Sequence, residues 1–185
     1  MTGHAKGPLR LIAAGFAAVL PFAAVLAQST ELMPLATTRS LMLDIADGDQ
    51  RAIIVGERGH ALVSESRSDW RQVADVPTRV TLTAVATAGE HAWAVGHDGV
   101  ILHSADGGLN WVQQRSDPWV PPSDDAEFDP QAGAPLLDVL FVDDQNGFAV
   151  GAYSLLLRTR DGGTTWERVA LSAEAGDAAD EAEVD

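Results

Sequence analysis

Cysteine is absent from all 185 residues of this sequence. Its absence excludes structural disulfides, cysteine-ligated zinc and a lipid anchor carried on cysteine. Tyrosine occurs only once, so any chemistry that needs a tyrosine nucleophile depends on a single residue. The absence of cysteine is compatible with an oxidising compartment.

Positive charge is scarce as well. The sequence has 12 Lys and Arg residues against 27 Asp and Glu residues, a formal net charge of −15 and a pI of about 4.5. Binding to nucleic acid without sequence preference needs a basic face, and docking onto anionic lipid needs basic clusters. The charge balance argues against both kinds of partner. The 46% of hydrophobic residues is sufficient for the core of one folded domain.

The apolar run near the start of the chain is short for a membrane span, which needs ~20 residues. Leu11–Leu26 contains glycine and proline and follows two cations, Lys6 and Arg10. Such a run with a small residue at Ala27 is typical of a secretory signal peptide, which we predict over residues 1–27. An uncleaved anchor is the alternative. The signal predicts secretion across the inner membrane to the periplasm or a thylakoid-lumen-like compartment.

Two eight-residue stretches of nearly the same form stand out in the rest of the sequence. Both read hydroxyl-x-Asp-Gly-Gly-x-x-Trp. Asp accepts hydrogen bonds from main-chain N–H groups two residues on, and glycine adopts positive φ without a steric clash. Each stretch predicts a tight turn between two strands, and its Trp has a large apolar surface to bury. The turn residues are Ser104, Asp106, Gly107, Gly108 and Trp111, and then Thr159, Asp161, Gly162, Gly163 and Trp166.

A longer frame surrounds these turns. A Val-Gly pair stands fifteen residues before each of the two tryptophans, and another stands fourteen before Trp70, where Asp-Gly-Gly is missing. Each pair follows an alternating apolar run of the kind that forms a strand. The pairs end at Gly56, Gly96 and Gly151, so the units are spaced by 40 and then 55 residues. A period near 40 with four strands per unit predicts β-propeller blades.

The predicted fold is all-β, a partial propeller of about three four-stranded blades. Residues 116–135 are rich in proline, which cannot donate to a strand ladder, and in acidic residues, so they form an inserted loop. The last segment carries acids and no cation and is expected to be disordered. The boundaries are a signal peptide at 1–27, a connector at 28–40, blades at about 41–75, 80–115 and 136–170, the insertion at 116–135, and an acidic tail at 171–185.

The two turn stretches resemble the Asp-box, or BNR, repeat. The whole frame, over roughly residues 38–170, resembles the photosystem II stability/assembly factor-like proteins. That resemblance implies an exported β-propeller, usually of about seven blades, in which the Asp-box is a folding element on the periphery of a blade. It also implies a non-catalytic assembly or accessory factor for a membrane complex, which in photosynthetic relatives is photosystem II.

Three blades are fewer than a closed propeller usually needs. Open ends of a blade stack expose a sheet edge and an apolar face. We therefore expect this chain to correspond to the N-terminal blades of a longer propeller, or to pair with a second half. Self-association through the unpaired blades is a further expectation.

Metal sites and catalysis have weaker signals. The histidines His60, His97 and His103 fall at ordinary hairpin positions, so no metal is predicted. The acids of the insertion and Asp143 lack an EF-hand spacing and fit plain turns. Sialidases, which also carry Asp-boxes, need a tyrosine nucleophile and an arginine cluster. Tyr153 is the one tyrosine and no arginine trio can be assigned, so the sequence predicts no enzyme activity and no cofactor.

The candidate partner-binding residues lie in loops at one end of the blades. They are Pro77, Thr78 and Arg79 between the first two blades, and Trp119 in the insertion. An aromatic residue among prolines can anchor a protein contact, or it can pack under its own loop. The leading function is an exported, non-catalytic, protein-binding assembly factor in the cell envelope. A carbohydrate-binding or glycosidase-like BNR protein and a remnant of a longer propeller are the alternatives.

Overall fold

The computed structural model describes residues 39–123 and 128–171. The predicted signal peptide, nearly all of the connector and nearly all of the acidic tail lie outside these described residues. Within the described part, no helix is long and apolar enough to cross a membrane.

The described chain forms three four-stranded antiparallel sheets, each built from consecutive strands. The first contains β1 (Met42–Asp47), β2 (Ala52–Gly56), β3 (Ala61–Ser64) and β4 (Arg71–Gln72). The second contains β5 (Leu82–Ala88), β6 (His91–Gly96), β7 (Ile101–Ser104) and β8 (Val112–Arg115). The third contains β9 (Leu136–Phe141), β10 (Gly147–Gly151), β11 (Leu156–Thr159) and β12 (Glu167–Arg168). The all-β prediction is confirmed.

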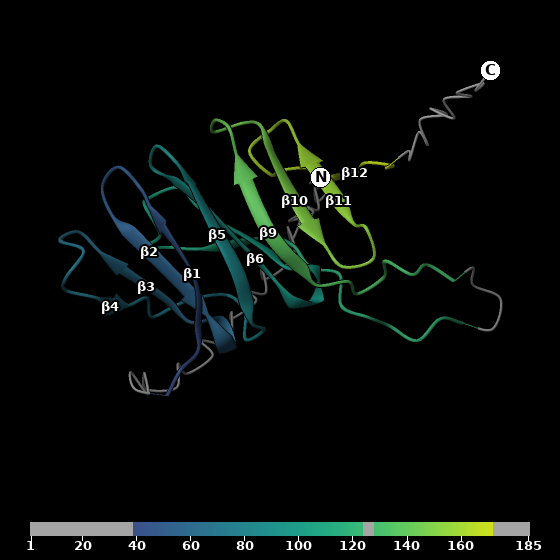
Figure 1. The fold of residues 1–185 in the computed structure, drawn as a ribbon, viewed down its shortest axis with the longest axis horizontal. Coiled ribbons are helices and arrows are strands. Elements are labelled where there is room, and N and C mark those ends of the chain that lie inside the picture. The colour runs from purple at the N-terminus through teal and green to yellow at the C-terminus, as the bar shows by residue number, and fades with distance from the viewer. Residues whose placement is uncertain (1–38, 124–127, 172–185) are drawn as a thin grey trace, which may run out of the picture.

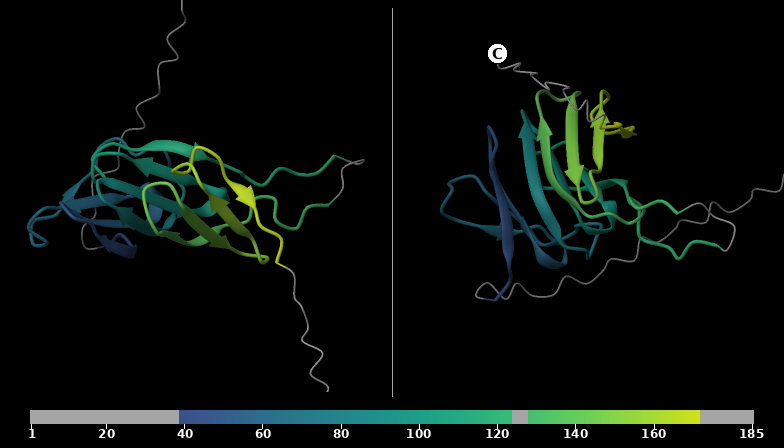
Figure 2. Two further views of the ribbon diagram at one scale, coloured as in Figure 1. Left: turned by 90° about the horizontal axis from the view of Figure 1, so that it is seen from above. Right: turned by 45° about the vertical axis from the view of Figure 1, so that its right-hand side comes forward.

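The three sheets stand side by side, face against face (Figures 1 and 2). The first strand of each sheet lies next to the first strand of its neighbour, so β1 contacts β5 and β5 contacts β9. This arrangement of separate sheets around their first strands is that of a partial propeller, as predicted.

The middle sheet is apolar on both faces because its residues alternate between two cores. On β6, Ala92 and Ala94 pack toward the first sheet, whereas Trp93 and Val95 pack toward the third. The first core joins the first and second sheets and includes Ile53, Val55, Val63, Leu82, Leu102 and Trp111. The second core joins the second and third sheets and includes Trp93, Ile101, Leu136, Phe141, Leu155 and Leu157.

The repeated glycine of the Val-Gly frame has a steric cause. A Cβ atom on Gly56 would lie 2.2 Å from the carbonyl oxygen of Leu41, and one on Gly96 would lie 2.1 Å from that of Thr81. The φ angles at these glycines are extended, so close main-chain approach to the first strand, rather than backbone conformation, requires glycine.

Candidate functional site

The Asp-box turn of the second sheet forms a closed hydrogen-bond network around one carboxylate. Oδ1 of Asp106 accepts bonds from the main-chain N–H groups of Leu109 (3.1 Å) and Asn110 (2.9 Å) and from the Ser104 hydroxyl (2.8 Å). The Ser104 oxygen in turn accepts from the N–H of Gly108 at 2.9 Å. Burial raises the pKa of Asp106, but hydrogen bonds from Asn110, Ser104 and Leu109 outweigh burial and hold that pKa below its usual value.

The turn of the third sheet repeats this network. Asp161 accepts from the N–H of Thr165 at 2.9 Å and from the Thr159 hydroxyl at 2.9 Å. The hydrogen bonds from Thr165 lower the pKa of Asp161. Its two glycines, Gly162 and Gly163, have φ of 67° and 88°, in the left-handed region that the pattern predicted.

One detail of the predicted turn differs. The sequence predicts that Asp accepts from the N–H two residues on, whereas Asp106 accepts from residues three and four positions on. The two left-handed glycines, Gly107 and Gly108, lengthen the loop beyond an Asx-turn. The carboxylate therefore spans a wider turn than a two-residue hairpin.

The Asp-box turns also join neighbouring sheets, which the sequence did not reveal. Arg51 of the first sheet donates from Nη1 to the carbonyl of Asp106 at 3.2 Å. Trp93 and Gln114 of the second sheet donate to the carbonyl of Gly162 at 3.0 and 2.9 Å. Each Asp-box turn therefore accepts hydrogen bonds from side chains of the sheet that precedes it in the sequence. We propose that the boxes are folding elements that fasten one sheet to the next.

The two box tryptophans occupy the cores between sheets. Trp111 is 6% exposed in the first core and donates from Nε1 to the carbonyl of Gly108 at 2.9 Å. Trp166 is partly buried against the second core and makes an edge-on contact with Phe141 at a centroid distance of 5.9 Å. Both pack against their own sheet and against its neighbour.

The candidate loop between the first two sheets is short and lies against the β2–β3 turn of the first sheet. Pro77 is exposed, and Thr78 and Arg79 are half-buried. Arg79 donates from Nη1 to the carbonyl of Thr78 at 2.9 Å. The same carbonyl lies so close to Gly59 that a Cβ there would be 2.3 Å away.

The insertion projects from the same end of the stack, beside the β6–β7 turn (Figures 1 and 2). Its base is anchored by polar contacts. The Asp117 carboxylate pairs with Arg115 at 2.8 Å, and the main-chain N–H of Asp117 donates to the main-chain carbonyl of Asp98 at 2.7 Å. Arg168 of β12 pairs with Asp129 at 2.7 Å, where hydrogen bonds from Arg168 and Gln131 lower the pKa of Asp129.

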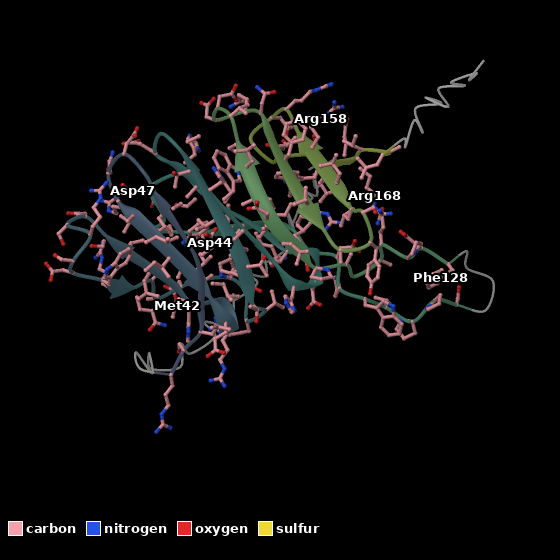
Figure 3. All side chains as sticks on the ribbon, viewed as in Figure 1. Met42, Asp44, Asp47, Phe128, Arg158 and Arg168 are labelled. Atoms are coloured by element: carbon pink, nitrogen blue, oxygen red, sulfur yellow. The ribbon has the colours of Figure 1, made fainter. Side chains whose placement is uncertain are left out.

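Apolar side chains on the insertion face solvent. Trp119 is 60% exposed, so it does not tuck under its own loop. Val120 is 67% exposed and Phe128 is 74% exposed (Figure 3). Trp119 stays a predicted partner-binding residue, and Phe128 is a second exposed aromatic residue of the insertion that the sequence pattern did not single out. The insertion therefore presents three apolar side chains to solvent. The loop with Pro77, Thr78 and Arg79 lies elsewhere, beside Gly59 in the β2–β3 turn of the first sheet.

Two histidines meet beside the second core. Nδ1 of His91 lies 2.9 Å from Nε2 of His103. The His91 ring stacks on Trp93 at a centroid distance of 5.8 Å, and the His103 ring lies tilted against Trp93 at 5.2 Å. Burial, and then the proximity of His91, lower the pKa of His103. Within residues 39–123 and 128–171, no group of three or more metal-ligating side chains converges.

The remaining candidates occupy surface turns. Asp143 accepts from the N–H groups of Gln145 and Asn146 in the β9–β10 turn, as an Asx-turn does. Tyr153 is 68% exposed at the β10–β11 turn, with φ of 56°, and its carbonyl accepts a hydrogen bond from Gln131 of the insertion at 3.0 Å. The lack of enzyme activity stays a prediction.

The three sheets and their two boxes define a partial β-propeller of Asp-box repeats. A family model described as photosynthesis system II assembly factor YCF48 matches residues 126–184. The chain is 56% identical over 39 residues to the photosystem II assembly lipoprotein Ycf48 of Prochlorococcus marinus strain SARG, which is 21% of this chain and 12% of that protein. It is 28% identical over 113 residues to the chloroplastic stability/assembly factor HCF136 of rice, 59% of this chain and 25% of that protein.

Solved structures give the same fold. A structure of YCF48 bound to a D1 peptide has a TM-score of 0.56 at 20% identity, covering 72% of this chain and 40% of that one. YCF48 from Cyanidioschyzon merolae has a TM-score of 0.52 at 23% identity, covering 70% and 39%. The resemblance to photosystem II assembly factor-like proteins is confirmed for part of the chain. The aligned part spans about a quarter or less of the curated relatives compared above.

Proposed function

We propose that this chain is an exported, non-catalytic propeller that binds a protein partner as an assembly or accessory factor. The observation that carries the proposal is the anchored insertion with exposed Trp119, Val120 and Phe128. Aromatic side chains held at low conformational cost are the usual anchors of protein interfaces. The partial similarity to Ycf48 and HCF136 supports the role in assembly.

The proposed partner is an extended segment of a membrane-complex subunit in the cell envelope. The similar YCF48 structure holds a D1 peptide, and in a photosynthetic host that subunit is the partner we propose here too. The net charge of −15 favours a partner segment that is neutral or basic. Nucleic acid is not a proposed partner for the same reason.

Export is part of the proposal. The curated Ycf48 relatives are named lipoproteins. None of the 185 residues here is cysteine, so no lipid can be carried on a cysteine of this sequence, and residues 1–27 would serve as a cleaved signal. N-terminal sequencing of protein from the envelope fraction should find a chain that begins at Gln28, and an intact Met1 on cytosolic protein would contradict export.

A binding titration tests the partner proposal. A fluorescent peptide from the D1 protein is titrated with purified chain, and its anisotropy gives the dissociation constant. The double variant Trp119→Ala, Phe128→Ala should weaken binding at least tenfold, a loss of about 1.4 kcal/mol. Val142→Ala is the matched control, because Val142 is 66% exposed on the β9–β10 turn at the opposite end. Equal affinity in wild type and double variant would refute the insertion as the binding site.

A further inference from the structure

The β3–β4 turn of the first sheet stands where the other two sheets have an Asp-box, but it lacks the box aspartate. In an Asp-box turn, the hydroxyl at the end of the third strand makes two hydrogen bonds. Ser104 donates to the carboxylate of Asp106 at 2.8 Å and accepts the N–H of Gly108 at 2.9 Å. Thr159 makes the equivalent bonds at 2.9 and 2.8 Å. The hydroxyl of an intact box is therefore paired both as a donor and as an acceptor.

Ser64 is the residue of the first sheet at this position, because the strand register places Ser64 on β3 where it places Ser104 on β7. Ser64 is 2% exposed, and its hydroxyl has no hydrogen-bond partner among the described residues. Ser66 stands where the box aspartate would, and its oxygen accepts the N–H of Asp69 at 3.0 Å. The turn thus closes without Ser64, and its buried hydroxyl is left for a partner from outside the chain.

Ser64 lines a hollow of about 480 Å³ beside this turn. Small-molecule sites are concave spaces of ~300–1,000 Å³ that combine apolar walls with a few polar groups. The hollow has this composition. Its other lining residues include an aromatic and an aliphatic side chain, Trp70 and Val63, and four charged side chains, Arg51, Arg71, Glu65 and Asp69.

Arg51 is a donor that is already fixed at the edge of the hollow. Its Nε and Nη2 lie 3.1 and 3.0 Å from Oε1 of Glu65, and its Nη1 donates to the carbonyl of Asp106 at 3.2 Å. The Arg51 side chain is only 16% exposed. A guanidinium has five N–H groups, so these contacts leave donors over for a ligand. A donor that is ordered in advance lowers the entropic cost of binding.

The lining charges favour a neutral ligand. Two guanidinium groups and two carboxylates cancel in formal charge, so the hollow attracts neither an anion nor a cation strongly. The hydroxyls of Ser64 and Ser66 can each donate and accept. Trp70 is half-buried and offers an apolar ring surface beside these polar groups. A ligand with several hydroxyls on an apolar ring face matches this combination.

We propose that the hollow at the β3–β4 turn of the first sheet binds a neutral saccharide. One sugar hydroxyl pairs with the Ser64 hydroxyl, other hydroxyls contact Arg51 and the carboxylates, and the C–H face of the ring packs on Trp70. The ligand is a free monosaccharide or the end of a glycan chain. The lining residues all lie outside the insertion at 116–135, so this inference goes beyond the proposed function, and either can fail without the other.

Nuclear magnetic resonance titration of the full chain tests the proposal. The indole N–H signal of Trp70 is assigned from its loss in Trp70→Phe. The neutral probes are glucose, galactose and N-acetylglucosamine, and the matched charged probes are glucuronate and glucosamine. At least one neutral sugar should shift the Trp70 signal in a saturable way and bind more tightly than both charged probes. Tighter binding of cellobiose, lactose or chitobiose than of its monosaccharide would identify a glycan end as the source, and equal affinity a free sugar.

Two alanine variants separate binding from folding. Ser64→Ala should weaken saccharide binding about fivefold or more, because it removes one hydrogen bond. Its urea midpoint should be unchanged or higher, since the lost hydroxyl is unpaired in the free chain. Ser104→Ala is the matched control. It removes a paired hydroxyl, so it should lower the urea midpoint and leave saccharide affinity unchanged.

Three results would overturn the saccharide site. The first is the absence of a saturable Trp70 shift with every neutral probe. The second is tighter binding of glucuronate or glucosamine than of the neutral sugars, because the site would then select charge. The third is wild-type saccharide affinity in Ser64→Ala, because the buried hydroxyl would then have no part in binding.

Discussion

Nδ1 of His91 and Nε2 of His103 lie 2.9 Å apart, with their rings stacked at a centroid distance of 5.1 Å. One imidazole must donate and the other accept, so the contact requires at least one neutral ring. The pair adjoins Trp93, which stacks on Phe141 of the third sheet. The pair therefore borders the contact between the second and third sheets.

We expect the chain to lose stability as pH falls below about 6.5, the ordinary histidine value. Burial lowers the pKa of His103 and of His60. A histidine with a lowered pKa binds its proton more tightly in the unfolded chain. Its contribution is therefore complete above the unfolded value and declines as pH falls toward the folded value. Urea unfolding between pH 7.5 and 5 measures the slope, which His103→Leu should make shallower. An unchanged slope would contradict the role of His103.

Trp111→Ala should destabilise the chain by about 3–5 kcal/mol, because it empties a buried site between the first and second sheets. Trp119→Ala removes a side chain that is 60% exposed and should leave the free energy of unfolding nearly unchanged. Trp166→Ala should fall between them, since Trp166 is only partly buried. Chemical denaturation of the three variants gives the order. Equal losses for Trp111 and Trp119 would show that the loop residue is structural.

Asp106→Ala should cost about 1 kcal/mol, since charged hydrogen bonds are strong but this turn is partly solvated. The loss should appear above pH 4 and shrink below it, because the lowered pKa makes the contribution depend on the ionised carboxylate. Asp69→Ala, in the degenerate turn of the first sheet, is the control and should have little effect. A similar loss at pH 3 and pH 7 would show that the carboxylate charge is unimportant.

Ser154→Gly should stabilise the chain by about 0.5 kcal/mol. Tyr153 and Ser154 have φ of 56° and 57°, whereas glycine takes the second position of the equivalent turns, at Gly59 and Gly99. The relief of left-handed strain exceeds the added entropy of glycine in the unfolded chain. Gly99→Ser is the opposite change and should destabilise, because Gly99 has φ of 56° and a Ser Cβ there would displace the Arg115 side chain that bonds the Gly99 carbonyl at 2.7 Å. A lower thermal midpoint for Ser154→Gly would refute the strain argument.

The strands and turns were predictable because their chemistry is local. The Asp106 network lies within eight residues, and the glycines at 56 and 96 mark main-chain contacts with strands about fifteen residues away. Such patterns repeat whenever the same turn repeats. Self-association through the outer sheets stays a prediction, since sequence periodicity says only that a face is apolar and nothing of what meets it.

The sequence by itself determined the repeat, the four-stranded units, the acidic charge and the position of the inserted loop. Only the tertiary structure decided which side chains meet across sheets. Arg51 reaches Asp106 across 55 residues, Asp44 reaches Val85 across 41, and Trp93 reaches Gly162 across 69. Stacking also decided that Trp93 is buried while its counterpart Phe148 is exposed. The physical reason is that a strand's own pattern sets which face is apolar, whereas burial depends on whether a second sheet lies against that face.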